Sequence, residues 1–199
     1  MLLYFYTMKL LLLILILVPI ISFGQLIPKE NNPIFGSRGI NTKRLDYING
    51  RPTSQYLNNP TISFYAKAFY QGQFCMYDND EFFSLMDSVL TNNNSTRPFY
   101  FYILNRIVEL SDGAVSEVAS EYCKNYIAKY PCEFLNYCNK KEFAIPLDTW
   151  TMFVGFMFDS TKDCEDWLQA IDKKIAVGCP QLQQQWDKLK PGIRTSINE

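Results

Sequence analysis

The chain has 199 residues, of which 48% are hydrophobic and 16% aromatic, so it is long enough to bury a substantial core within one domain. Lysine and arginine number 19 against 20 aspartate and glutamate, and the two signs are interleaved along the sequence, which gives no electrostatic footprint for nucleic acid and no polybasic membrane segment. Histidine is absent, which excludes Ser-His-Asp and Cys-His catalysis and disfavours a zinc site. We therefore expect no cofactor and no metal.

The N-terminus has the pattern of a secretory signal. Lys9 is followed by an apolar run from Leu10 to Ile21, and small residues precede Gln25. This order of a charged start, a hydrophobic middle and a small-residue cleavage site predicts a signal peptide over residues 1–24, removed near Gly24 and Gln25. We therefore expect an exported protein, periplasmic or secreted after cleavage.

Two alternatives concern the same N-terminal segment. Met8 stands directly before Lys9, so it is a second candidate for the start codon beside Met1. An uncleaved membrane anchor is the other alternative, but Pro19 and the short length of the run argue against it, because a span needs about 20 apolar residues. Once the signal is removed we expect no stable membrane span and a formal charge of −2, since Lys9 is the only charged residue lost.

Residues 25–60 are expected to form an irregular arm or linker. Asparagine, proline and glycine punctuate this segment, for example at Asn49-Gly50, and no helical or strand period continues through it. A binding arm that orders on contact is the alternative, because Ile48 and Tyr56 are among its apolar residues. The single helical domain is expected to cover residues 61–199.

The stretch from Arg97 to Leu110 is predicted to be the central helix of that domain. Its apolar side chains fall on two helical faces, which leaves Asn105, Arg106 and Glu109 as the polar sector. A helix with two apolar faces must contact neighbours on both sides, so we expect the rest of the domain to pack around it.

Helical periodicity predicts about seven helices in an all-α fold. Besides the central helix, the predicted helices cover residues 61–74, 80–90, 115–130, 148–158, 161–177 and a last segment from 180 that ends before Pro191, and residues 132–137 form a further short helical segment. The short connections predict antiparallel hairpins, and a helical-repeat-like stack is one arrangement of them, although no sequence repeat defines it. Gly155, within an apolar helix, predicts the close approach of a neighbour.

Six cysteines follow the predicted signal: Cys75, Cys123, Cys132, Cys138, Cys164 and Cys179. An exported chain meets an oxidising environment, so this even number allows up to three disulfides. The pairing stays open, with one exclusion. The predicted helix over 161–177 separates Cys164 from Cys179 by about 20 Å, which is beyond the reach of a disulfide.

Charged residues on the central hairpin are the candidates for a site. Arg106 lies on an almost wholly apolar helix, so it either pairs with a carboxylate as a structural bridge or, together with Glu109, contacts an anionic ligand or a partner. A buried member of the set Glu109, Glu117 and Glu121 would suit the general acid of a glycan hydrolase, whereas solvent exposure would leave them without such a role. No residue is assigned to catalysis, cofactor binding or metal binding.

Several segments resemble a known group of proteins. The segments are Arg97-Pro-Phe-Tyr-Phe-Tyr, Leu110-Ser-Asp-Gly-Ala-Val-Ser-Glu and Glu121-Tyr-Cys, together with the signal end Ser22-Phe-Gly-Gln. They are similar to uncharacterised exported all-helical proteins of Bacteroidetes over about residues 61 to 138. The resemblance implies an exported helical fold and no known activity.

These observations favour a non-enzymatic protein of the cell envelope that binds a protein partner. The lack of a catalytic constellation and the abundance of aromatic residues support this hypothesis, since tyrosine and tryptophan suit recognition surfaces. A carboxylate-dependent glycan hydrolase is one alternative, and an inhibitor or immunity protein for a secreted toxin is another. We expect no nucleic acid partner.

Overall fold

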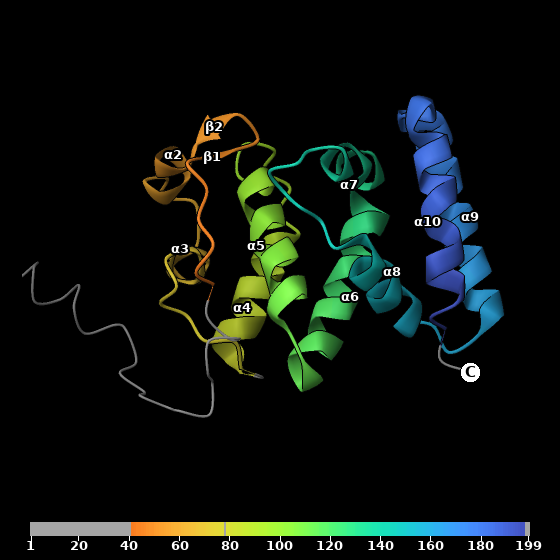
Figure 1. Cartoon of the computed structure of the whole chain (residues 1–199), viewed down its shortest axis with the longest axis horizontal. Helices are drawn as coiled ribbons and strands as arrows, with labels where there is room; N and C mark the ends of the chain where they lie inside the picture. The colour runs from red at the N-terminus through yellow and green to blue at the C-terminus, as the bar shows by residue number, and fades with distance from the viewer. Residues whose placement is uncertain (1–40, 78, 198–199) are drawn as a thin grey trace, which may run out of the picture. The chain divides into compact units, whose positions relative to one another are not determined.

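The computed structural model describes residues 41–77 and 79–197, and the regular secondary structure of these residues is helical apart from one short hairpin of strands (Figure 1). This confirms the expected all-α fold. The predicted signal peptide, its cleavage site and the arm through residue 40 lie outside the described residues. None of the described helices has the length and the hydropathy that a bilayer-spanning segment requires.

The described residues form nine α-helices, one 3-10 helix and two strands. Their bounds are β1 (Tyr47–Ile48), β2 (Arg51–Pro52), α2 (Thr53–Leu57), α3 (Phe64–Tyr70), α4 (Asp80–Val89), α5 (Arg97–Leu110), α6 (Gly113–Lys129), α7 (Pro131–Cys138), α8 (Leu147–Phe156), α9 (Thr161–Gly178), the 3-10 helix η2 (Pro180–Leu182) and α10 (Gln183–Arg194). The helix α4 packs on α5, α5 on α6, α6 on α8, α8 on α10, and α10 on α9 (Figure 1). The pairs α4–α5, α5–α6 and α9–α10 follow one another along the chain, as predicted hairpins do, whereas α6–α8 and α8–α10 bring together helices that are not consecutive.

The central helix has the bounds that the sequence predicts, from Arg97 to Leu110. Its two apolar faces contact different parts of the chain. Phe99 stacks on Tyr56 of α2, with ring centres 5.4 Å apart. Phe101 faces the other way, 5.0 Å from the ring of Tyr126 and 5.7 Å from that of Trp150. Because α5 is covered on both sides, it joins the N-terminal elements to the C-terminal ones.

The predicted polar sector of α5 is buried except at Glu109, which corrects the expectation of a polar face. Asn105 is fully buried, and its side-chain amide donates to the carbonyl oxygen of Phe143 at 2.6 Å. The indole nitrogen of Trp150 donates to the Asn105 side-chain oxygen at 3.0 Å. A buried amide keeps its hydrogen bonds in this way, so Asn105 holds the connection before α8 against the central helix.

The expected irregular arm is wrong for its described part, residues 41–60. Asn49 and Gly50 have φ angles of 52° and 72°, which form the tight turn between β1 and β2. Ile48 and Tyr56 are buried in the core, and the Tyr56 hydroxyl donates to the Ile48 carbonyl oxygen at 3.2 Å. This segment has a weak intrinsic tendency to form helix or strand. Burial of its two large apolar side chains against α5 stabilises its folded conformation instead.

The last helix also runs further than predicted. It continues through Pro191 to Arg194, although a proline within a helix removes one backbone hydrogen bond. Burial of Ile193 and the close contact of Gly192 with Thr151 of α8 hold this turn in helical form. Gly155 of α8 lies directly against the backbone of Ile193, which confirms the predicted close approach of a neighbour.

Replacing these glycines tests the contact between α8 and α10. A methyl group at Gly155 meets the carbonyl oxygen of Ile193 and lies 2.6 Å from Cβ of Ser196, whereas at Gly192 it lies 2.8 Å from the Thr151 hydroxyl. The Thr151 side chain moves more easily than backbone. We therefore expect Gly155→Ala to lower the free energy of unfolding by about 1–3 kcal/mol, measured by urea denaturation.

Gly192→Ala is the matched control, because both substitutions add the same methyl group and the same gain in helix propensity. Its effect should be clearly smaller. Equal effects of the two substitutions would contradict the tight contact at Gly155.

Candidate functional site

The disulfide joins two helices that are remote in sequence. Cys132 at the start of α7 is bonded to Cys179 directly after α9, at a sequence separation of 47 and with Cα atoms 5.8 Å apart. One of the three bridges that the sequence allows is therefore formed. The predicted exclusion of a bond between Cys164 and Cys179 is confirmed, because Cys179 has another partner. The remaining described cysteines are free: Cys75, Cys123, Cys138 and Cys164.

Burial keeps several of these thiols protonated. It raises the pKa of Cys123 well above its usual value and that of Cys138 to about 12. The thiolate is the reactive form of cysteine, so neither side chain has the environment of a nucleophile. Among the residues that the structure describes, no group of histidine, cysteine, aspartate and glutamate is placed to hold a metal ion.

A largely buried ion pair links α5 to α7. Arg97, the first residue of α5, donates from Nε and Nη2 to the two carboxylate oxygens of Glu133, both at 2.8 Å. The Tyr126 hydroxyl of α6 donates to the same carboxylate at 2.6 Å. The Tyr130 ring covers the guanidinium, with Cζ of Arg97 4.0 Å from the ring centre. Three consecutive helices therefore meet at one forked ion pair.

This geometry shifts the ionisation of its members. The hydrogen bonds to Glu133 raise the pKa of Arg97. Burial raises the pKa of the Tyr126 hydroxyl, and the Glu133 charge raises it further. Arg97 thus stays charged and Tyr126 stays neutral. In these states the two arginine N–H groups and the tyrosine hydroxyl can all donate hydrogen bonds to the Glu133 carboxylate.

The end of α6 also fixes the connection between α4 and α5. The Tyr130 hydroxyl donates to the carbonyl oxygen of Thr91 at 2.8 Å, and Nζ of Lys129 donates to that of Leu90 at 2.7 Å. These carbonyl groups follow the last turn of α4, where helical partners are lacking. We call the segment Lys129–Glu133 the α6–α7 junction.

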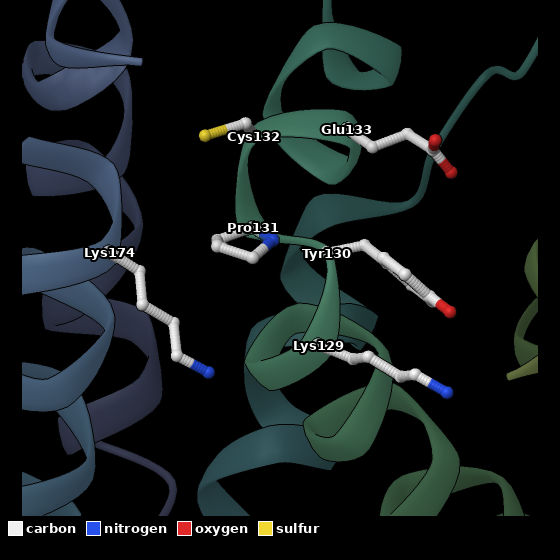
Figure 2. Close-up of a pocket in the computed structure, with 6 residues that line it drawn as sticks. All are labelled: Lys129, Tyr130, Pro131, Cys132, Glu133 and Lys174. Carbon is white, nitrogen blue, oxygen red and sulfur yellow. The ribbon is translucent and has the colours of Figure 1, made fainter. Parts of the chain in front are cut away.

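A shallow pocket of about 340 Å³ lies at the α6–α7 junction, lined by Lys129, Tyr130, Pro131, Cys132, Glu133 and Lys174. Figure 2 shows Lys174 on one side of the junction, whereas Lys129, Tyr130 and Glu133 point to the other side. The Glu133 carboxylate and the Tyr130 hydroxyl already have partners within the protein. These side chains do not converge on one point, so the pocket lacks the arrangement of a catalytic centre.

Of the two alternatives for Arg106, the structure contains the pair with a carboxylate. Its side chain is only 6% exposed and forms an ion pair with Glu109. Its Nε also donates to the side-chain oxygen of Asn41 at 3.1 Å. Asn41 is fully buried, so Arg106 anchors the beginning of the described chain to α5.

The glutamates considered for hydrolase chemistry lie at the surface. Glu109, Glu117 and Glu121 are all exposed, and none of them lines the pocket at the α6–α7 junction. A general acid with a raised pKa requires a desolvated carboxyl group. The buried environment predicted for such an acid is therefore not present at these three positions.

Sequence reasoning did not single out Arg97 or Glu133. One signal was available, because an arginine at the head of an apolar helix needs a compensating charge. Nothing in the sequence indicates which of the 20 acidic residues supplies it. The two partners are 36 positions apart in the sequence, and the whole of α6 lies between them.

Comparisons with known proteins give no relative for this chain. No protein-family model matches it, and neither a curated protein nor a solved structure matches it.

A double-mutant cycle tests the ion pair. We expect Arg97→Met to lower the free energy of unfolding by about 2–4 kcal/mol, because it leaves the Glu133 carboxylate unpaired in a largely buried position. The double variant with Glu133→Leu should lose less free energy of unfolding than the sum of the losses in the two single variants. Urea denaturation of the four proteins measures the coupling.

The exposed pair Lys162–Asp166 on α9 provides a matched control. Lys162→Met and Asp166→Leu should change stability little and without coupling, because water screens both charges. Additive effects of Arg97→Met and Glu133→Leu would contradict the structural role of the buried pair.

Proposed function

We propose that the protein is exported and acts as a non-enzymatic helical module of the cell envelope that binds a protein partner. The observation that carries this proposal is a pair of large apolar side chains exposed on α8. Met152 is 40% exposed and Phe156 is 50% exposed. They lie four residues apart and therefore one above the other on the same helical face.

The surroundings of this pair support recognition. The other faces of α8 pack on α6 and α10, and Trp150 and Val154 are fully buried. Apolar side chains that remain exposed on an otherwise covered helix lose water-accessible surface when a partner binds. Aromatic and methionine side chains are enriched in the cores of protein interfaces. Tyr47 and Phe64 add exposed aromatic surface on β1 and α3.

Export is supported by two further observations. The apolar run from Leu10 to Ile21 after Lys9 has the pattern of a secretory signal. The Cys132–Cys179 disulfide is of a kind that persists in oxidising compartments. The resemblance to exported all-helical proteins of Bacteroidetes agrees with this compartment, and it is part of the proposal.

Site-specific photocrosslinking in the native cells tests the proposed function. The full chain carries p-benzoylphenylalanine in place of Phe156, and in a second strain in place of Met152. We expect both positions to give the same UV-dependent product, identified by mass spectrometry as one protein joined to this chain. The mass of the recovered chain should correspond to residues 25–199 because the signal has been removed.

Gln169 is the matched control position, since it is exposed on the polar face of α9. Crosslinker at this position should give no such product. The proposed function is wrong if Phe156 and Met152 give no product, or give the same mixture as Gln169.

A further inference from the structure

The two cysteines of the Cys132–Cys179 disulfide differ in their access to solvent. Cys132 is the second residue of α7, is half-buried, and lines the pocket of about 340 Å³ at the α6–α7 junction. Cys179 directly follows α9, is only 2% exposed, and is not among the residues that line this pocket. The pocket therefore leads from solvent to the Cys132 end of the bond.

The helix ends give the two cysteines opposite electrostatic environments. The start of a helix carries a partial positive charge and its end a partial negative charge, because backbone groups there lack helical partners. Cys132 lies in the first turn of α7, whereas Cys179 lies just beyond the last turn of α9. The 3-10 helix η2 after Cys179 has only three residues, too few for a comparable effect at its start. A thiolate is thus favoured at Cys132 and disfavoured at the buried Cys179.

The charged side chains around Cys132 agree with this difference. A Cβ atom at Gly178 of α9 would lie 3.2 Å from the Cys132 sulfur, so Gly178 faces that sulfur. Lys174 lies one turn earlier on the same face of α9, and Figure 2 shows the Cys132 sulfur pointing to the side of Lys174. Lys129 and Glu133 point to the other side, where Glu133 is neutralised by an ion pair. The charge on the side of the sulfur is therefore positive, which favours a thiolate.

Cys138 shows the contrasting environment within the same helix. It is the last residue of α7 and, like Cys132, is half-buried. Burial raises the pKa of the Cys138 thiol to about 12. The two cysteines of α7 thus allow a comparison between the start and the end of one helix.

We propose that the Cys132–Cys179 bond exchanges with small thiols, with Cys132 as the sulfur under attack and Cys179 as the leaving group. The pocket beside Cys132 has a volume in the range of small-molecule sites. This proposal does not depend on the protein partner of the proposed function, because it needs only the disulfide and the pocket.

The exchange takes place in two steps. The thiolate of a small thiol attacks the Cys132 sulfur and forms a mixed disulfide, while the bond to Cys179 breaks and Cys179 leaves with the electron pair and takes a proton from water. A second thiolate then attacks the sulfur of the small molecule and releases Cys132 as a thiolate. Two small thiols are oxidised to their disulfide and the protein disulfide is reduced. An excess of the oxidised small molecule reverses both steps and restores the link between α7 and α9.

Reduced glutathione tests the attacked sulfur in the unchanged protein. The reaction is quenched with acid at early times, free thiols are alkylated, and peptide mass spectrometry locates the glutathione. We expect the mixed disulfide at Cys132, with Cys179 recovered as an alkylated thiol. The proposal is overturned if glutathione is found on Cys179 instead, or if the bond reacts only after the protein has been unfolded in urea.

The variant Cys179→Ser tests the reactivity of Cys132 without the competing disulfide. With oxidised glutathione at neutral pH, we expect Cys132 to be modified at least about tenfold faster than Cys138 in the same molecule. The rate at Cys132 should reach half its maximum below pH about 8.5, the usual pKa of a cysteine thiol. Circular dichroism checks that the variant is folded.

Two controls complete the comparison. In the variant Cys132→Ser, the buried Cys179 thiol should react at least about tenfold more slowly than Cys132 does in Cys179→Ser. In urea, Cys132 and Cys138 of the Cys179→Ser variant should react at similar rates, because unfolding removes both helix ends. Equal rates at these two cysteines in the folded variant would overturn the proposal.

Discussion

A buried positive charge at the start of the central helix constrains the rest of this structure. Arg97 lies at the head of α5, and its charge needs a carboxylate because an unpaired buried guanidinium is strongly destabilising. Glu133 meets this need and thereby places the start of α7 beside α5. Tyr126 binds the same carboxylate from α6. The disulfide from Cys132 then extends the linkage to the end of α9.

The sequence predicts the helices of the fold better than the contacts between them. The central helix Arg97–Leu110 has its predicted bounds, because its apolar residues recur at helical spacing and Pro98 suits its first turn. The prediction is wrong for residues 41–60 because their local propensity is weak and their order comes from tertiary contacts. Ile48 and Tyr56 pack on a helix that begins some forty residues later.

The candidate site was less predictable than the fold for the same reason. Arg106 could be chosen from the sequence because it stands alone on an apolar helix, and its pairing with Glu109 is local. The ion pair of Arg97 with Glu133 and the bond of Cys132 with Cys179 depend on how whole helices pack.

Native-state hydrogen exchange tests most directly whether the described residues form one cooperative unit around α5. The packing of Tyr56 on Phe99 predicts that peptides covering residues 45–57 exchange with a free energy of opening close to that of peptides from α5. Exchange of residues 45–57 at a much lower free energy, while α5 stays protected, would contradict this account and would return the segment to the status of an independent arm.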